Sequence, residues 1–254
     1  MWFDANYMKL NESKCHFIIA TNSSEHYWIK VGDQIIWESQ LEKLLGLKVD
    51  KTLRFNQHVT KLCNEASGKV TALKRLINIV PIERKKILMN SFVESQFSYC
   101  PLVWMFFGSR RLNKRINRIH ERGLRIVYKD NISTFEDLLK KNGSVCVHHR
   151  NIQFVAIEMF KVKNGLASKM MMNLFKFKTY RDKHSFIIPS VKTEYMGKLS
   201  LRYFGPVVWE IMLPERFKSI ILLETFKNDI KKWVPKNCPC RLCKHFVASV
   251  GFID

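Results

Sequence analysis

Hydrophobic positions recur every three or four residues through the middle of the chain. This spacing is typical of amphipathic helices, which bury one apolar face. The longest such pattern consists of Phe55, Val59, Leu62, Cys63, Ala66, Val70, Leu73, Leu76, Ile77 and Val80. Pro81 ends the pattern and suits the first position of a second helix, where its missing N–H is not needed. We therefore predict helices over residues 55–80 and from Pro81 to about residue 97.

Further helices are predicted in the second half of the chain. Residues 110–129 combine helical apolar spacing with many basic side chains. The sequence Ser133-Thr-Phe-Glu136 has the capping-box pattern that opens a helix, and Gly165 is suited to closing a helix over residues 149–164. The remaining expected elements are helices over residues 199–212 and 222–233 and a short strand at residues 186–188.

The first fifty residues have a different pattern. Short apolar or β-branched runs separated by turn residues indicate strands, at residues 15–21, 27–31, 34–37 and 43–49. Gly32-Asp33 is suited to a hairpin turn between the second and third runs. A sheet of this size buries too little apolar surface to be stable alone. We therefore expect the chain to begin inside a larger fold, or the sheet to depend on the helices that follow.

The expected fold class is α+β and mainly α, with a small antiparallel sheet followed by helices. The sequence predicts four regions, namely a β-rich region (1–50), a first helical region (51–165), a second helical region (166–236) and a cysteine-rich tail (237–254). The apolar stretch at residues 100–107 is much shorter than the roughly twenty residues of a membrane span. We expect no membrane partner.

The net charge of +21 is large and unevenly distributed. Residues 1–50 contain five Lys or Arg and seven Asp or Glu, which leaves a net charge of +23 on residues 51–254. A basic excess of this size attracts polyanions. Because 46% of the residues are hydrophobic, the basic part is expected to fold around a core and not to be a disordered tail.

The helix predicted at 110–129 is the main candidate for RNA or DNA binding. Its candidate contact residues are Arg110, Arg111, Lys114, Arg115, Arg118, Arg122, Arg125 and Lys129, opposite an apolar face of Leu112, Ile116, Ile119, Gly123, Ile126 and Val127. Like charges three or four residues apart destabilise a helix, and a bound polyanion would relieve that repulsion. The helix would extend about 28 Å. The alternative is a solvated face whose Arg stems cover apolar neighbours.

The cysteine-rich tail is a second candidate site. Cys238, Cys240 and Cys243 lie within six residues, and His245 follows. Thiolate and imidazole are the usual ligands of zinc, so a structural zinc ion is one interpretation, and reduced thiols without a ligand are the other. Cys146, His148 and His149 could complete a site only if the fold brings them close.

The remaining cysteines, histidines and tryptophans are expected to be structural. The four cysteines outside the tail lie singly in segments read as apolar helices, and no secretory signal precedes them, so we expect buried thiols and an intracellular protein, nuclear or cytoplasmic. His58 and His120 are expected to be hydrogen-bonded core histidines. Trp104, Trp209 and Trp233 could stack on bases, but their apolar helical contexts favour the core.

A series of short motifs resembles the end of the palm, the thumb and the tail of a reverse transcriptase encoded by a jockey-type non-LTR retrotransposon. The motifs, in order, are Trp2 to Cys15, Glu42 to Asp50, Phe55 to Val59, Ser95 to Met105, Ile119 to Tyr128, His149 to Asn151, Phe204 to Trp209, Phe226 to Trp233 and Asn237 to Lys244. They cover essentially the whole chain. The resemblance implies that the basic helix belongs to a thumb that holds template and primer.

The resemblance also implies what this chain lacks. The family's polymerase site holds two magnesium ions with aspartates, including a Tyr-x-Asp-Asp pair, and neither element occurs in this sequence. Lys14 matches a late-palm lysine near the triphosphate, and Leu45-Gly46 matches the primer-gripping turn. We therefore expect no catalysis and no cofactor in the isolated chain. Magnesium would belong to the full-length polymerase, whose N-terminal part is a further expected partner.

Two functions remain open at this point. The chain is either a truncated RNA-directed DNA polymerase that keeps nucleic-acid binding, or a non-catalytic interaction protein, including the non-functional product of a decayed retroelement.

Overall fold

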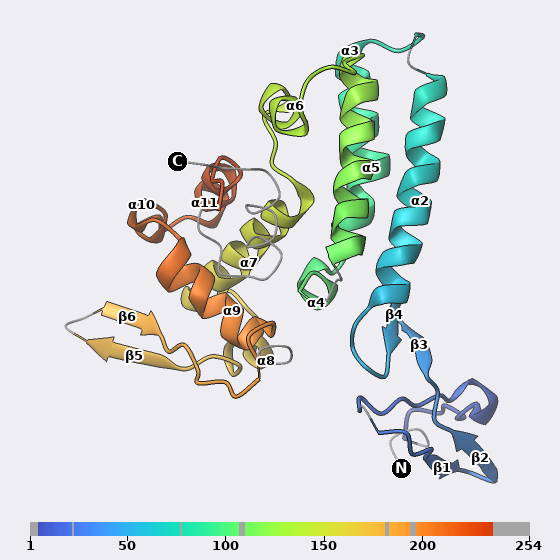
Figure 1. Ribbon diagram of the computed structural model, residues 1–254. Coiled ribbons are helices and arrows are strands. Elements are labelled where there is room, and N and C mark those ends of the chain that lie inside the picture. Colours follow the sequence, from blue (N-terminus) through green and yellow to red (C-terminus); the bar gives the residue numbers. More distant parts are fainter. Residues whose placement is uncertain are drawn as a thin grey trace. The chain divides into compact units, whose positions relative to one another are not determined.

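The computed structural model describes residues 5–21, 23–76, 78–106, 110–180, 183–193 and 197–235. The chain is α+β and mainly helical, with three antiparallel two-stranded sheets among these residues (Figure 1). It divides into two compact units, Met1–Lys61 and Leu62–Asp254. The boundary falls inside the long helix α2 (Asn56–Arg75). The expected boundaries at residues 165 and 236 stay predictions.

The first unit contains a short 3-10 helix, η1 (Glu12–Lys14), and two hairpins. Strands β1 (Trp28–Val31) and β2 (Gln34–Trp37) pair around Gly32-Asp33, as the turn sequence predicts, and Gly32 has a φ of 59°. Residues 15–21 do not form the expected strand. They make separate hydrogen bonds instead, in which Phe17 O accepts from Ser39 N and Thr21 N donates to Lys51 O. The apolar pattern of this segment could not show whether a neighbouring strand would pair with it, and a strand needs such a partner for its ladder of backbone hydrogen bonds.

The second hairpin corrects the single strand expected at residues 43–49. Strands β3 (Leu41–Leu44) and β4 (Leu47–Asp50) are antiparallel, and Leu45-Gly46 is the turn between them. Both turn residues have positive φ, 48° and 89°, as a two-residue type I′ turn requires. Leucine rarely adopts this conformation, so the residue type at position 45 does not predict a turn, although the resemblance to the reverse transcriptase placed one at Leu45-Gly46.

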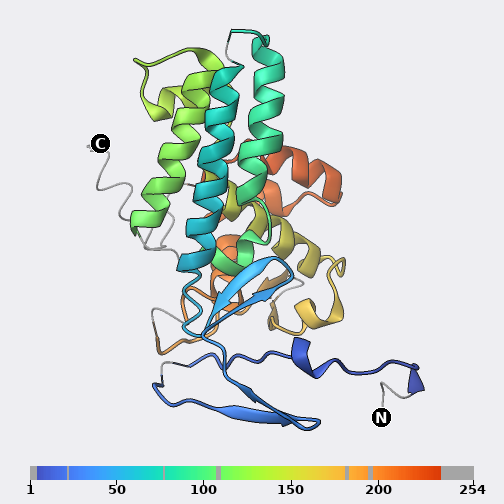
Figure 2. The same ribbon diagram turned by 90° about the vertical axis from the view of Figure 1, so that its right-hand side faces the viewer.

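The first part of the second unit is a set of long helices. After α2 come α3 (Ile82–Leu88), the π-helical η2 (Met89–Val93), the 3-10 segment η3 (Glu94–Phe97), α4 (Pro101–Trp104) and α5 (Arg110–Tyr128). Figures 1 and 2 show α2 and α5 running in the same direction, with α3 running in the opposite direction. A Cβ on Gly123 would lie 2.3 Å from Met89 Cε, so α5 and η2 approach closely where α5 has no side chain.

The helix expected over residues 55–80 ends earlier than its apolar pattern. α2 stops at Arg75, and residues 76 and 78–80 form a turn. The helix expected from Pro81 to residue 97 is present but changes from α to π to 3-10 geometry along its length. The basic helix spans Arg110–Tyr128, within one residue of its predicted end.

The remaining elements are one long helix, α7 (Val147–Lys163), and shorter helices and strands. The shorter ones are α6 (Phe135–Asn142), α8 (Lys169–Met172), β5 (Phe177–Tyr180), β6 (Lys183–Phe186), α9 (Leu201–Val207), the π-helical η4 (Val208–Met212), α10 (Glu215–Lys218) and α11 (Leu223–Ile230). The N-cap of α6 is Thr134, whose hydroxyl accepts from Asp137 N at 3.2 Å. The capping box expected to start at Ser133 is therefore wrong, because Ser133 Oγ donates to Asp130 at 2.8 Å.

The core of this part is built around Trp209. The rings of Phe160 and Phe226 stack at 4.5 Å between centroids, and Trp209 lies 5.9 Å from Phe226. Trp104 and Trp233 are also buried, so the core assignment of the three tryptophans is confirmed. The strand expected at residues 186–188 is displaced to β6, and its partner β5 was not predicted.

Candidate nucleic-acid interface

The helix α5 has one apolar face and one basic face. At about 100° per residue, its cations from Arg111 to Arg125 fall on one side of the helix, within an arc of about 100°, and Lys129 follows directly after its last residue. The opposite side carries the buried residues Ile116, Ile119, His120, Gly123, Leu124 and Val127. Leu124 and His120 were absent from the predicted apolar face, and Leu112 and Ile126 are only partly buried.

Most cations of the basic face are open to solvent. Arg111, Lys114, Arg118, Arg122 and Lys129 are exposed, whereas Arg115 and Arg125 are half-buried. The side chain of Arg110 lies outside the described part of the structure. Because the exposed guanidinium and ammonium groups share one side of a straight helix, they form a row suited to a linear polyanion.

Three members of the row are held by neutral polar groups of α2 and the turn after it. Arg115 donates to Asn64 Oδ1 at 2.5 Å, and Arg122 donates to Ser67 Oγ at 3.4 Å. Lys129 Nζ donates to Asn78 Oδ1 at 3.2 Å. The three cations are seven residues apart, which is the spacing of contacts between parallel helices. These bonds orient the side chains without neutralising them, since none of the three acceptors carries a charge.

Arg125 differs from the other members of the row. Its guanidinium donates to Glu121 Oε1 at 2.6 Å and to the carbonyl of Asp130 at 3.3 Å. Its charge is therefore offset within the chain, and it is a poorer phosphate ligand than its sequence position suggests. The basic face, as used below, consists of Arg111, Lys114, Arg115, Arg118, Arg122 and Lys129.

A buried charged cluster holds α5 from its other side. His120 Nε2 lies 3.2 Å from Glu94 Oε1, and Arg150 of α7 forms an ion pair with Glu94 Oε2. Arg150 also donates to Glu94 O at 3.1 Å. Burial alone would raise the pKa of Glu94, but His120 and Arg150 bring it below the ordinary value of 4.5. The cluster fixes the rotation of α5 about its axis, which keeps the basic face outward.

The other sites expected from the sequence are two positions of the first unit and the cysteine-rich tail. Lys14 is an exposed residue at the end of η1, and Leu45-Gly46 is an exposed hairpin turn. Cys238, Cys240, Cys243 and His245 lie outside the described residues. Within the described residues, no three His, Cys, Asp or Glu side chains are placed to hold a metal ion.

The cysteines outside the tail only partly match expectation. Cys63 and Cys146 are buried, and burial raises the pKa of the Cys63 thiol to about 11. Cys15 and Cys100, however, lie outside the helices, and Cys100 is exposed. Their apolar sequence neighbours suggested a helical core position that the backbone does not provide. His58 and His120 are buried, as expected. The expected hydrogen bond is present at His58, whose Nδ1 accepts from Lys48 N at 3.4 Å. His120 has its ion-pair contact with Glu94 instead.

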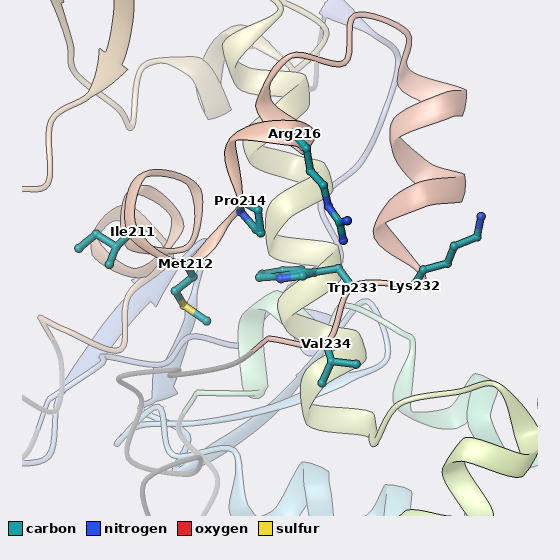
Figure 3. A pocket seen from close by; sticks show the side chains of 7 residues that line it. All are labelled: Ile211, Met212, Pro214, Arg216, Lys232, Trp233 and Val234. Atoms are coloured by element: carbon teal, nitrogen blue, oxygen red, sulfur yellow. The ribbon is translucent and has the colours of Figure 1, made fainter. Parts of the chain in front are cut away.

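A pocket of about 570 Å³ lies between η4, α10 and the segment that follows α11 (Figure 3). It is lined by Ile211, Met212, Pro214, Arg216, Lys232, Trp233 and Val234. In Figure 3 the indole of Trp233 lies among these side chains and Lys232 extends away from it. Among the described residues, the lining contains two cations and no carboxylate or nucleophile, so these residues offer binding surface.

An exposed tryptophan pair was missed by the sequence analysis. Trp28 and Trp37 are directly opposite each other on β1 and β2 and are 55% and 62% exposed. Ile35, on the same side of the hairpin, is 57% exposed. The alternating pattern of residues predicted the two strands correctly. It could not show that the side of the hairpin with both tryptophans is exposed to solvent.

Comparisons with known proteins identify no relative. No protein-family model, no curated protein and no solved structure matches the chain. None of the helices in the described ranges has both the length and the apolar composition of a membrane-spanning segment.

Proposed function

We propose that the chain binds RNA or DNA through the basic face of α5, as the thumb-like part of a retrotransposon-encoded reverse transcriptase. The observation that carries the proposal is the row of exposed cations on one side of a helix whose other side is buried. Charge repulsion along such a row destabilises the free protein and is relieved when phosphates bind. Arginine suits this role because its planar fork matches phosphate oxygens.

In this proposal the chain has no polymerase activity of its own. Two-metal catalysis of phosphoryl transfer needs carboxylates that hold both magnesium ions, and those aspartates would be supplied by an N-terminal polymerase part. Lys14 and Leu45-Gly46 would then complete that part of the site and would not act alone. The basic face would hold the template and primer duplex near it.

The salt dependence of binding tests the proposal. If the basic face neutralises around four phosphates, the slope of log affinity against log salt should be about −3 to −4. The double reversal Arg118→Glu plus Arg122→Glu should weaken binding. It should flatten the slope by about 2, because two phosphate contacts are lost and each contributes about 0.9. Fluorescence anisotropy with a labelled RNA–DNA duplex between 50 and 300 mM salt, about the range where counterion release is measured, gives both values.

A second double reversal is the matched control. Lys178→Glu plus Arg202→Glu removes two exposed cations of β5 and α9 and lowers the net charge by the same amount. If the general charge of the chain attracts the nucleic acid, both variants should lose affinity equally. The proposal requires the Arg118 and Arg122 variant to lose much more, and equal losses would reject it.

A non-catalytic interaction protein is the second candidate, because Trp28 and Trp37 form an exposed aromatic pair. Exposed aromatic side chains are frequent anchors of protein interfaces. For this function, nucleic-acid affinity should not respond to the Arg118 and Arg122 reversal. Substituting both tryptophans by Ser should instead abolish association of the chain with a protein partner or with itself.

A further inference from the structure

The turn between α2 and α3 presents aliphatic side chains to solvent. Ile79 is 77% exposed, Ile82 is 42% exposed and Leu76 is 38% exposed. These three residues, called the apolar tip, lie at one end of the long helices. The apolar pattern that predicted a longer helix at residues 55–80 therefore continues into residues that the fold leaves uncovered.

The described residues of this turn make local backbone hydrogen bonds. The backbone N–H groups of Ile79 and Val80 both donate to Leu76 O at 3.1 Å, and Leu76 N donates to Leu73 O at 3.1 Å. Pro81 fixes the backbone at the start of α3, where Lys85 N donates to Pro81 O. Because these hydrogen bonds hold the backbone of Ile79 and Val80 in place, Ile79 should lose little conformational freedom on binding.

Exposed cations flank the apolar tip along the chain. Lys74 and Arg75 precede it in α2, and Arg84 follows it in α3, all exposed. The nearby Glu83 pairs with Lys86 at 3.1 Å, which offsets its charge. The Lys129–Asn78 hydrogen bond joins the tip to the end of the basic face. A ligand for an aliphatic surface bordered by cations should combine negative charge with flat apolar faces, as a nucleic acid does. An apolar protein surface is a poorer ligand, because it would remove water from those cations without pairing their charge.

We propose that the apolar tip packs against an unstacked base where a duplex bound along α5 meets a single strand. The inference rests on the proposed nucleic-acid binding and adds the feature of the ligand that the tip recognises. In other proteins, aliphatic side chains insert between base steps as wedges. The free energy lost by unstacking the bases is offset by wider contact between the protein and the bent nucleic acid. Here Ile79 would fill that role, while Lys74, Arg75 and Arg84 contact the adjacent phosphates.

The test uses 2-aminopurine, a base whose fluorescence rises when it unstacks, placed at the junction of an RNA–DNA duplex with a single strand. Saturating the substrate with wild-type protein should raise the fluorescence. Ile79→Ser should lose most of this rise and keep the salt slope of binding, whereas Ile79→Leu should retain the rise. The matched control is Ile221→Ser, at an aliphatic residue that is 83% exposed and lies outside the tip, and it should behave as wild type.

The outcomes separate this inference from the proposed function. Salt-dependent binding without a rise in fluorescence, or an unchanged rise in the Ile79→Ser variant, overturns the inference alone. Absence of binding by the wild-type protein at low salt overturns both. If the Ile79→Ser variant gives the same rise in fluorescence as wild type but has a lower mass in sedimentation, the tip is a protein contact and the inference is wrong.

Discussion

The helices α5 and α7 are similar in length but are used in opposite ways. α7 is covered on nearly every side, with ten of its residues buried, including Val155, Met159 and Phe160. α5 is covered on one side only, and its other side carries the basic face. We therefore expect α7 to contribute mainly to stability and the basic face of α5 mainly to binding. Removing buried side chains from α7 should destabilise the fold, and removing charge from α5 should weaken binding.

The largest expected effect is at the ion pair that links α7 to α5. Replacing Arg150 by Met leaves the charge of Glu94 buried with only His120 beside it. Breaking a buried pair in this way should lower the free energy of unfolding by about 3–5 kcal/mol, measured by urea denaturation. The double variant Glu94→Gln plus Arg150→Met leaves no uncompensated charge and should recover much of the loss. If the double variant is no more stable than Arg150→Met, the pair does not act as described.

The second expected effect is a loss of stability in acid. The pKa of Glu94 is lower in the folded chain than its ordinary value of 4.5, so the folded state holds the ionised form more tightly than the unfolded state does. This contribution is complete above pH 4.5 and disappears as the pH falls through the folded pKa. Asp130 also has a lowered pKa, so the unfolding free energy must be compared between wild type and Glu94→Gln. The difference between them should change with pH in that acid range.

A third prediction compares how the two helices end. α7 is followed by Gly165 at a φ of 69°, whereas α5 is followed by Lys129 at a φ of 52°. Gly165→Ala should destabilise the fold by about 1 kcal/mol, and Lys129→Gly should stabilise it by up to about 1 kcal/mol, because glycine adopts this conformation without strain. Thermal or urea unfolding measures both. The Lys129→Gly variant should nevertheless bind nucleic acid more weakly, and a gain in both quantities would show that Lys129 does not contact phosphate.

The smallest effects on stability are expected within the basic face. Arg118→Gln should change the free energy of unfolding by less than about 0.5 kcal/mol and flatten the salt slope by about 1. Arg125→Gln should change the slope less, because Glu121 already pairs with Arg125. Anisotropy titrations of the two variants give the comparison. Equal changes would mean that the Glu121 pair opens when nucleic acid binds.

The sequence predicted the helices better than their surroundings. α5 was placed within a residue because its apolar and basic positions follow one period over nineteen residues. α2 was predicted too long because the same period continues through Leu76, whose burial depends on whether a neighbouring element covers it. Strand pairing at β3 and β4 was missed because positive φ at Leu45 is set by the hairpin and not by the residue type.

The candidate site was predicted in part. The composition of the basic face followed from helical spacing, and the Glu121–Arg125 pair at i, i+4 was also readable from it. The bonds of Arg115 to Asn64 and of Arg122 to Ser67 join residues more than fifty positions apart, and no local pattern specifies them. The resemblance to a reverse transcriptase stays a prediction.

The π-helical turn at η2 has a consequence for insertions and deletions. Lys85, Met89, Val93 and Phe97 are buried at intervals of four residues, although an ideal α-helix would rotate such a series by about 40° at each step. The wider π turn contains one more residue than an α turn and keeps the series facing inward. Deleting one residue of η2 would let the segment relax to α geometry and turn Glu94 away from His120 and Arg150. A codon lost there would therefore detach the support that aims the cations of α5, without altering any cation itself.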